Sequence, residues 1–406
     1  MVTRYSTNKG TYTFAPWPSF EEDEIRAVEK VLRSGKVNQW TGSEVTSFEK
    51  EFVDYLGVDH AISLANGSVA LDIALTVLGI GLGDEVIVTP RTFVASASCI
   101  VLRGAIPVFV DVEIDTQNIT VKAVKDAISS KTKAIIAVHL AGWPCELDEL
   151  RKVCDDNGLF LIEDCAQAHG ARYRGKSVGS FGDFAAFSFC QDKIMTTGGE
   201  GGMLVTNNED LWKNAWRFKD HGKDYDAVFC DEHPPGFRWL IKTFGTNYRM
   251  TEMQAAIGRI QLKKLDSWVE KRRYFASILS EEFKKFDALR VTCVPEDVYH
   301  SYYKYYVFVR PERLRESWSR DRILYELSEK GIPCGTGIFP EVYLEEAFKK
   351  IEWRTSEGDK KRLEGAKQLG ETSMMFLVHP TLTEENMHYV VEQVKEVMAH
   401  AEVVFV

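Results

Sequence analysis

The feature that most constrains the fold is the alternation of short apolar runs with longer helical patterns between residues 61 and 206. The runs are apolar on both faces, which is typical of buried strands in a mostly parallel sheet. The predicted strands are 61–64, 85–89, 107–111, 134–138, 159–164, 184–189 and 203–206. The predicted helices between them are 68–78, 94–103, 121–129 and 146–157. This part of the chain is therefore predicted to be a three-layer α/β/α domain.

The pattern changes on both sides of this region. An aromatic arm, 14–20, precedes a helix that we expect to begin after Ser19 as N-cap, and a second helix covers about 43–56. After about residue 250, helices are predicted at 251–286, 319–330, 359–369 and 383–401, with a strand at 302–309. We expect a large domain at 1–255, including the arm, and a smaller α+β domain at 256–406.

Composition excludes several functional classes. A net charge of −10 argues against general nucleic-acid binding. The eight cysteines form no C-x-x-C pair, so we expect free thiols and a reducing compartment. The stretch 1–7 lacks the apolar core of a signal peptide, and no apolar run approaches the ~20 residues that span a bilayer. We expect a cytoplasmic protein that does not contact a membrane.

Polar residues follow several of the predicted strands, where open α/β sheets bind their ligands. They lie at 66–68, 89–93, His139, 164–169 and 188–193. Lys193 stands in the last of these loops, five residues after Ser188. A lysine there can act as a Schiff-base nucleophile if burial or a nearby cation favours its neutral amine. The alternative is an ordinary solvated loop lysine.

Two further positions favour a charged ligand. Gly67 and Ser68 open an apolar helix, whose N-terminus suits a phosphate, although Ser68 could simply cap the helix. Asp164 ends an apolar strand, where a carboxylate is costly unless a cation or hydrogen bonds compensate it. The alternative for Asp164 is a capping role in the following turn.

Other common motifs are missing from the sequence. There is no G-x-x-x-x-G-K-[ST], no completed G-x-G-x-x-G and no G-x-S-x-G. The histidines are dispersed, so we expect no metal site. The glycine-rich run 198–202 precedes a strand rather than a helix, which favours a tight turn over a phosphate-binding loop.

The most specific segments occur in a fixed order. They are ANGS at 65–68, GDEVIV at 83–88, EDCAQAHG at 163–170, S-x-x-x-x-K at 188–193, GEGG at 199–202 and TNYRMTE at 246–252. Their combination resembles the fold type I, pyridoxal-phosphate-dependent sugar aminotransferases of the DegT/StrS type. The resemblance extends from about Phe14 to the last predicted helix.

The resemblance implies a role for each of these positions. Lys193 would form a Schiff base with pyridoxal phosphate and then move the proton during the reaction. Asp164 would keep the pyridine nitrogen protonated. The remaining cofactor contacts would be Phe93 on the ring face, Gln167 at the phenolic oxygen, Gly67, Ser68 and Ser188 at the phosphate, and Asn247 from a second subunit. A homodimer with shared active sites follows.

The implied activity is amination of a keto-deoxysugar, usually nucleotide-linked, with glutamate as amino donor, for polysaccharide or secondary-metabolite synthesis. A family branch that dehydrates sugars carries histidine where Lys193 stands, so lysine favours transamination. A sugar dehydratase and a non-catalytic regulatory protein are the alternatives. The segment 337–343 departs from the family pattern facing the sugar, which leaves the sugar open. Arg249 is a candidate substrate contact, with a structural salt bridge as its alternative.

Overall fold

A computed structural model describes residues 12–232, 239–358 and 360–403, and an eight-stranded sheet lies at its centre. The strand order is β1-β9-β8-β5-β4-β2-β3-β14. β9 is antiparallel to β1 and β8, and all other neighbours are parallel. The strand bounds are β1 (His60–Leu64), β2 (Glu85–Val88), β3 (Ile106–Phe109), β4 (Thr132–Val138), β5 (Phe160–Asp164), β8 (Phe184–Ser188), β9 (Gly202–Thr206) and β14 (Arg354–Thr355). The predicted, mostly parallel sheet is confirmed.

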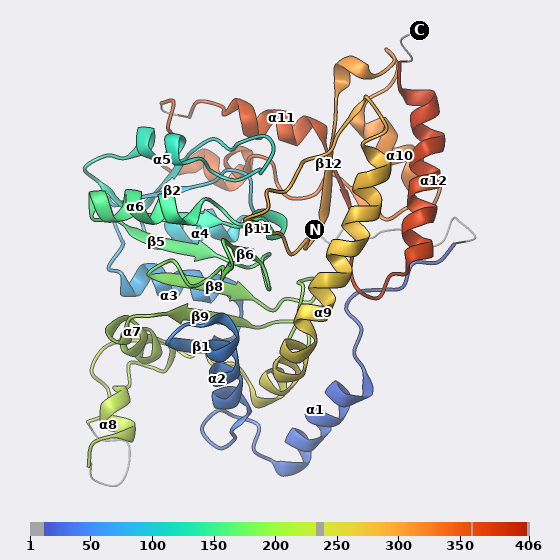
Figure 1. Cartoon of the computed structure of the whole chain (residues 1–406). Coiled ribbons are helices and arrows are strands. Elements are labelled where there is room, and N and C mark those ends of the chain that lie inside the picture. The colour runs from blue at the N-terminus through green and yellow to red at the C-terminus, as the bar shows by residue number, and fades with distance from the viewer. Residues whose placement is uncertain (1–11, 233–238, 359, 404–406) are drawn as a thin grey trace.

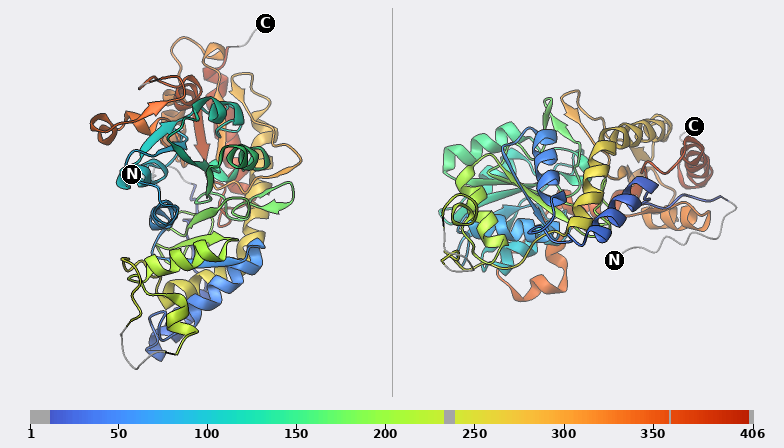
Figure 2. Two further views of the ribbon diagram at one scale, coloured as in Figure 1. Left: turned by 90° about the vertical axis from the view of Figure 1, so that its left-hand side faces the viewer. Right: turned by 90° about the horizontal axis from the view of Figure 1, so that it is seen from below.

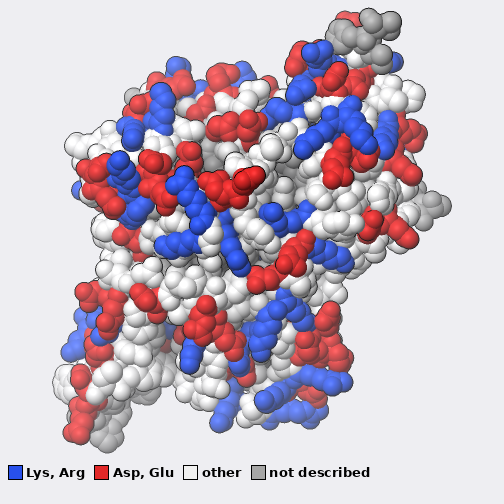
Figure 3. Space-filling view, viewed as in Figure 1, with Lys and Arg blue, Asp and Glu red and all other residues white. Residues whose placement is uncertain are grey.

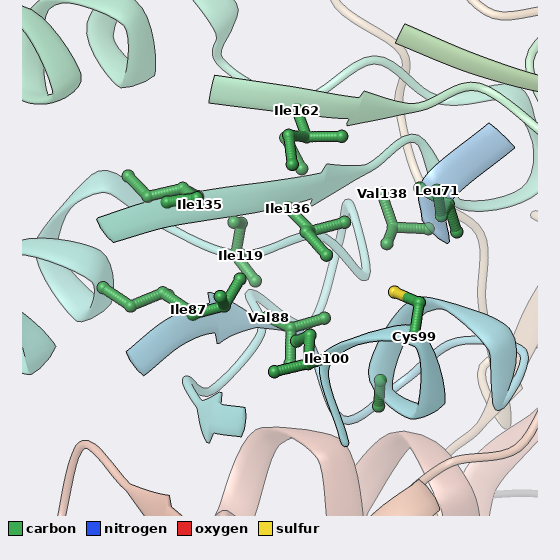
Figure 4. Close-up of a cluster of buried hydrophobic side chains, with 14 of the residues drawn as sticks. Leu71, Ile87, Val88, Cys99, Ile100, Ile119, Ile135, Ile136, Val138 and Ile162 are labelled. Atoms are coloured by element: carbon green, nitrogen blue, oxygen red, sulfur yellow. The ribbon is translucent and has the colours of Figure 1, made fainter. Parts of the chain in front are cut away.

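Helices cover both faces of this sheet, as the side chains of β8 show. Phe184 and Ala186 share a core cluster with α3 (Gly67–Val77) and α4 (Ala95–Leu102). The alternate residues Ala185 and Phe187 share a second cluster with α2 (Glu44–Leu56) and α9 (Glu252–Phe283). Figure 4 shows the first cluster, in which strand residues such as Val88 and Val138 lie near Cys99 and Ile100 of α4.

Figure 1 also shows the remaining helices. They are α1 (Glu22–Ser34), α5 (Val121–Ala127), α6 (Leu147–Asn157), α7 (Glu209–Lys219), α8 (Tyr225–Phe229), α10 (Arg320–Glu329), α11 (Glu364–Thr372) and α12 (Glu384–Ala401). Of these, α10 and α12 lie with the C-terminal part of the chain. Short 3-10 turns lie at Leu140–Gly142, Pro311–Arg313, Val342–Leu344 and Glu346–Lys350. A small sheet is formed by β11 (Val298–Tyr299), β6 (Arg172–Tyr173) and β7 (Lys176–Ser177).

The C-terminal part has its own antiparallel sheet, β10-β12-β15-β13. Its strands are Leu289–Arg290, Tyr305–Val309, Ser373–Phe376 and Cys334–Gly335, in that order. They share a core with α10, α12 and the second half of α9. Figure 1 shows α9, in yellow, running from the region of α1 and α2 to that of α12. The division at residue 255 stays a prediction, because α9 spans it and β14 returns to the large sheet.

Several element boundaries differ from the predicted ones. Ser19 is not the N-cap of α1, because the carboxylates of Glu21 and Glu24 form the capping box. β12 begins at Tyr305 rather than 302, because Tyr302 has a positive φ of 47°. The helix predicted at 359–369 begins at Glu364, and residue 359 lies outside the described residues.

The aromatic arm packs against its own chain. The Trp17 indole lies 5.2 Å from that of Trp268 and stacks on His379. α1 then lies beside α9, held by Lys264 and its ion pair with Glu21 (Figure 2). Acidic and basic side chains are interspersed over the face in Figure 3. Within the described ranges, no helix is long and apolar enough to cross a bilayer.

Candidate active site

The ends of two neighbouring strands place the predicted site residues together. Asp164 is the last residue of β5 and Ser188 the last of β8, and Asp164 pairs with Ala186 across the parallel ladder. Lys193 follows in the next loop, where its N–H donates to the carbonyl of Cys190 at 3.0 Å. The carboxyl ends of parallel strands therefore gather these groups at one edge, as the sequence predicted.

The side chain of Lys193 is held in a partly buried position. It is 15% exposed, and its Nζ lies 3.8 Å from Asp192 Oδ1 and 5.0 Å from the centroid of the Tyr303 ring. The indole N–H of Trp17 donates to the Lys193 carbonyl at 2.8 Å. The aromatic arm thus fixes the backbone of the lysine from outside the sheet. The Lys193 amine is not the freely solvated group of the alternative interpretation.

Asp164 carries a buried carboxylate with two hydrogen bonds. The side chain of this residue is nearly enclosed, and Ser96 Oγ donates to Oδ2 at 2.6 Å while the Ala166 N–H donates to Oδ1 at 3.1 Å. Within the described part of the chain, Asp164 forms no ion pair. A cationic ligand would further stabilise a buried carboxylate in this state.

The N-terminus of α3 lies against the end of β8. The Asn66 side chain caps the helix by accepting from the Val69 N–H at 3.0 Å, so Ser68 is not the cap and its side chain is exposed. A Cβ on Gly67 would lie 2.7 Å from Ser188 Cβ, so only glycine fits there without movement. The N-terminus of α3 and these two serines would suit a phosphate.

Gln167 and Phe93 offer two further contacts near this edge. The Gln167 Oε1 accepts from the Ala141 N–H at 2.9 Å, which fixes the orientation of the amide. Phe93 is 48% exposed although it belongs to a buried segment, and its ring lies 6.1 Å from that of Phe339. An exposed aromatic face at this position suits a flat ligand.

Asn247 and Arg249 lie on a segment beside β1, where Arg249 bridges to Leu64. Arg249 Nη1 forms an ion pair with the buried Asp220 at 2.8 Å, and Lys223 contacts the same oxygen at 2.8 Å. The structural salt bridge is therefore present. Asn247 is exposed and its Oδ1 accepts from the Arg249 N–H at 3.3 Å. Contacts of these two residues with a ligand remain predictions.

His139, at the end of β4, has a structural partner rather than a free ring. Its Nε2 lies 3.1 Å from Glu163 Oε2, and its Nδ1 accepts from the Cys145 N–H. Burial opposes ionisation of Glu163, but the His139 ring and backbone N–H groups outweigh it and lower the pKa of this carboxyl. The pair holds the ends of β4 and β5 in place directly before Asp164.

The sequence interpretation missed the groups that surround Lys193. They are Trp17, Asp192, Arg272, Tyr303 and Lys304, and it also missed Ser96, which donates to Asp164. Burial opposes ionisation of Asp192, but Lys193 and Lys304 outweigh it and lower its pKa. Burial also lowers the pKa of His169 to about 3, with Lys193 adding to the effect. The sequence did contain one signal for these groups, because Lys304 is a charged residue inside the aromatic run 302–306.

Comparisons with known proteins identify the family. The sequence model described as the DegT/DnrJ/EryC1/StrS aminotransferase family matches residues 18–395. The chain is 40% identical over 286 residues to GDP-perosamine synthase of Vibrio cholerae, covering 70% of this chain and 74% of the relative. It is 33% identical over 379 residues to GDP-perosamine synthase of Escherichia coli O157:H7, covering 93% and 96%. The structure of an aminotransferase from Psychrobacter cryohalolentis superposes with a TM-score of 0.92 at 52% identity, covering 95% of this chain and 99% of that one.

Proposed function

Because the chain belongs to the DegT/DnrJ/EryC1/StrS aminotransferase family and is an aminotransferase, we propose that it uses pyridoxal phosphate to aminate a nucleotide-linked keto-deoxysugar, with glutamate as donor. The observation that carries the proposal is the convergence of the Lys193 amine, the buried Asp164 carboxylate, which has no ion pair within the described residues, and the Gly67–Ser188 contact.

The residues present fit this cofactor on three counts. Asp164 is a buried carboxylate without a cationic partner in the described residues, which suits a protonated ring nitrogen. The α3 N-terminus, with Gly67 pressed against Ser188, suits the phosphate. Phe93 presents a half-exposed ring for stacking, and Lys193 presents an amine that is partly accessible.

When bound, pyridoxal phosphate acts as an electron sink that stabilises negative charge on the carbon next to the amine. Asp164 would hold the ring nitrogen in its protonated form, and Ser96 holds Asp164. Lys193 would bind the cofactor covalently and afterwards carry the proton at Nζ between the two carbons that exchange it. Trp17 fixes the Lys193 backbone, so the amine returns to the same position. Gln167 would orient the ring through its phenolic oxygen.

The names of the relatives support the substrate class. GDP-perosamine synthases are named for a GDP-linked amino sugar, and another relative, 31% identical over 394 residues, is a spore coat polysaccharide biosynthesis protein of Bacillus subtilis. We therefore propose a role in aminosugar synthesis for a polysaccharide. The protein would act in the cytoplasm as a homodimer in which Asn247 reaches the phosphate bound by the other subunit.

The direct test is incubation of the purified protein with ¹⁵N-labelled glutamate and a set of nucleotide-linked 4-keto-6-deoxysugars. The proposal predicts a product that carries one labelled nitrogen in place of the keto oxygen. A product that has lost a hydroxyl without gaining nitrogen would support the dehydratase alternative. No change with any keto sugar would contradict the substrate class.

A further inference from the structure

Lys304 lies beside the same aromatic ring as the reactive lysine. Its Nζ is 4.7 Å from the centroid of the Tyr303 ring, and the Nζ of Lys193 is 5.0 Å from that centroid. The Tyr303 hydroxyl donates to Asp192, which also contacts Lys193. Two lysine side chains thus lie beside one phenol, whose hydroxyl is bonded to the carboxylate that Lys193 contacts.

The positive charge here exceeds the negative charge. Arg272 is also close, with its Nη1 donating to the carbonyl of Tyr303 at 3.1 Å, while its Nε and Nη2 have no partner in the described part of the chain. In the same part, neither Lys304 nor Arg272 forms an ion pair, and Asp192 is the carboxylate that contacts the Tyr303 hydroxyl and Lys193. Three basic side chains therefore surround Tyr303 beside one carboxylate, an arrangement that an anionic ligand would stabilise.

Of the cations without an ion pair, Lys304 is the one that a ligand can reach. Its side chain is partly exposed, whereas Arg272 is 1% exposed beneath Trp17. Burial lowers the pKa of Lys304 to about 8. Arg272 and Lys193 contribute to this lowering of the pKa, whereas Asp192 opposes it. Arg272 instead acts as a positioning residue, because it bonds the carbonyls that precede Lys304.

The backbone that carries Lys304 is fixed to the cofactor side of the site. The Tyr303 N–H donates to the Ala141 carbonyl at 2.8 Å, and the Ala141 N–H donates to Gln167. The Ser301 N–H donates to the Gly142 carbonyl at 3.1 Å. The position of Lys304 is therefore tied to Gln167 as well as to Lys193.

We propose that Lys304 binds a carboxylate of the amino-acid donor next to the Lys193 amine, an assignment that rests on the proposed function. In an α-amino acid, the carboxylate is bonded to the carbon that carries the transferred amine, so it must lie close to the reacting centre. The phosphates of a nucleotide sugar are separated from the keto carbon by the sugar ring. A cation that shares the Tyr303 ring with Lys193 matches the first geometry.

The test measures ligand binding rather than turnover, by calorimetry on enzyme loaded with pyridoxal phosphate. Glutarate, which has the carboxylates of the donor but no amine, is the first probe, and inorganic pyrophosphate is the second. The variants are Lys304→Met, Lys304→Arg and a matched control, Lys176→Met. Lys176 is a suitable control because its Nζ also lies near an aromatic ring, 4.3 Å from the centroid of Phe181. Because a hydrogen bond to a charged group is lost, we expect Lys304→Met to weaken glutarate binding by about 10- to 100-fold. Lys304→Arg and the control should stay near the wild-type value, and pyrophosphate binding should not change.

Three results would overturn the assignment. The first is unchanged glutarate binding in Lys304→Met, and the second is no glutarate binding by a wild-type enzyme that retains the cofactor. The third is a loss of pyrophosphate binding equal to that of glutarate, which would assign Lys304 to the phosphates of the sugar nucleotide. The visible absorption band of bound pyridoxal phosphate distinguishes these results from failure of the proposed function. If the protein did not use this cofactor, even the wild-type protein would lack the band.

Discussion

Gly67 provides the most direct structural test of the phosphate position. In Gly67→Ala, the new Cβ would lie 2.7 Å from Ser188 Cβ and 3.0 Å from its Cα. Carbon atoms in contact are normally about 3.5–4.0 Å apart, so one of the two segments must move by about 1 Å. The obstacle includes the backbone of a buried strand end, which cannot rotate away.

Two energies of opposite sign decide the outcome for this variant. Alanine gains at most about 1 kcal/mol over glycine inside a helix, and less at its first turn. Overpacking against a backbone costs about 1–3 kcal/mol. We therefore expect the unfolding free energy of the cofactor-free protein to fall by about 1–2 kcal/mol in urea titrations. Displacement of Ser188 from the α3 N-terminus should also weaken pyridoxal phosphate binding by about 10-fold or more.

Gly81→Ala is the matched control. The nearest atom to its new Cβ would be the Arg103 carbonyl oxygen at 3.8 Å, an ordinary contact. We expect its unfolding free energy to stay within about 0.5 kcal/mol of the wild-type value and its cofactor affinity to be unchanged. If Gly67→Ala matched this control in both stability and cofactor affinity, the phosphate position that we assign would be wrong.

Three further changes test separate parts of the account. Ser96→Ala removes the 2.6 Å hydrogen bond to the buried Asp164 carboxylate and should lower the unfolding free energy by about 1.5–3 kcal/mol in urea; a loss below about 0.5 kcal/mol would contradict this support. Within the described residues, Arg249→Gln leaves Lys223 as the ion-pair partner of Asp220, so we expect about 1–3 kcal/mol of lost stability, whereas a higher KM for the sugar at unchanged stability would identify a substrate contact instead. Burial lowers the pKa of His300 to about 3, so between pH 6.5 and 3 the unfolded chain binds a proton that the folded chain does not, and folding weakens as the pH falls. His300→Gln should therefore lose about 2 kcal/mol less stability than the wild-type protein between pH 7 and pH 5 in urea, and an equal loss in both proteins would refute the buried neutral ring.

All strands of the large sheet except β14 could be predicted from sequence, because each is a short run of mostly apolar residues that the helices on both faces of the sheet must cover. Asp164, Ser188 and Lys193 could be identified as a group because they follow such strands, and parallel strands place these ends at one edge. The order of the motifs added Phe93, Gln167 and Asn247 through the family resemblance, not through local physics.

The contacts that cross the chain could not be predicted in the same way. Trp17 reaches Lys193 over 176 positions, and no local pattern encodes that distance. Tyr302 interrupts a run of apolar and aromatic residues that reads as a strand, because Arg272 of a distant helix bonds its carbonyl. β14 has too few residues to show a period, and its pairing with β3 depends on the return of the chain to the large domain. These features follow from tertiary packing.

The central claim is that Lys193 holds pyridoxal phosphate and that glutamate supplies the amino group. The measurement that tests it most directly is the visible absorption spectrum of the purified protein, recorded before and after glutamate is added, beside the same spectra of Lys193→Ala. The account predicts a yellow wild-type protein whose band glutamate bleaches, and a Lys193→Ala variant that neither holds the cofactor covalently nor turns over. A wild-type protein that remains colourless with added cofactor, or a Lys193→Ala variant with near-normal activity, would contradict it.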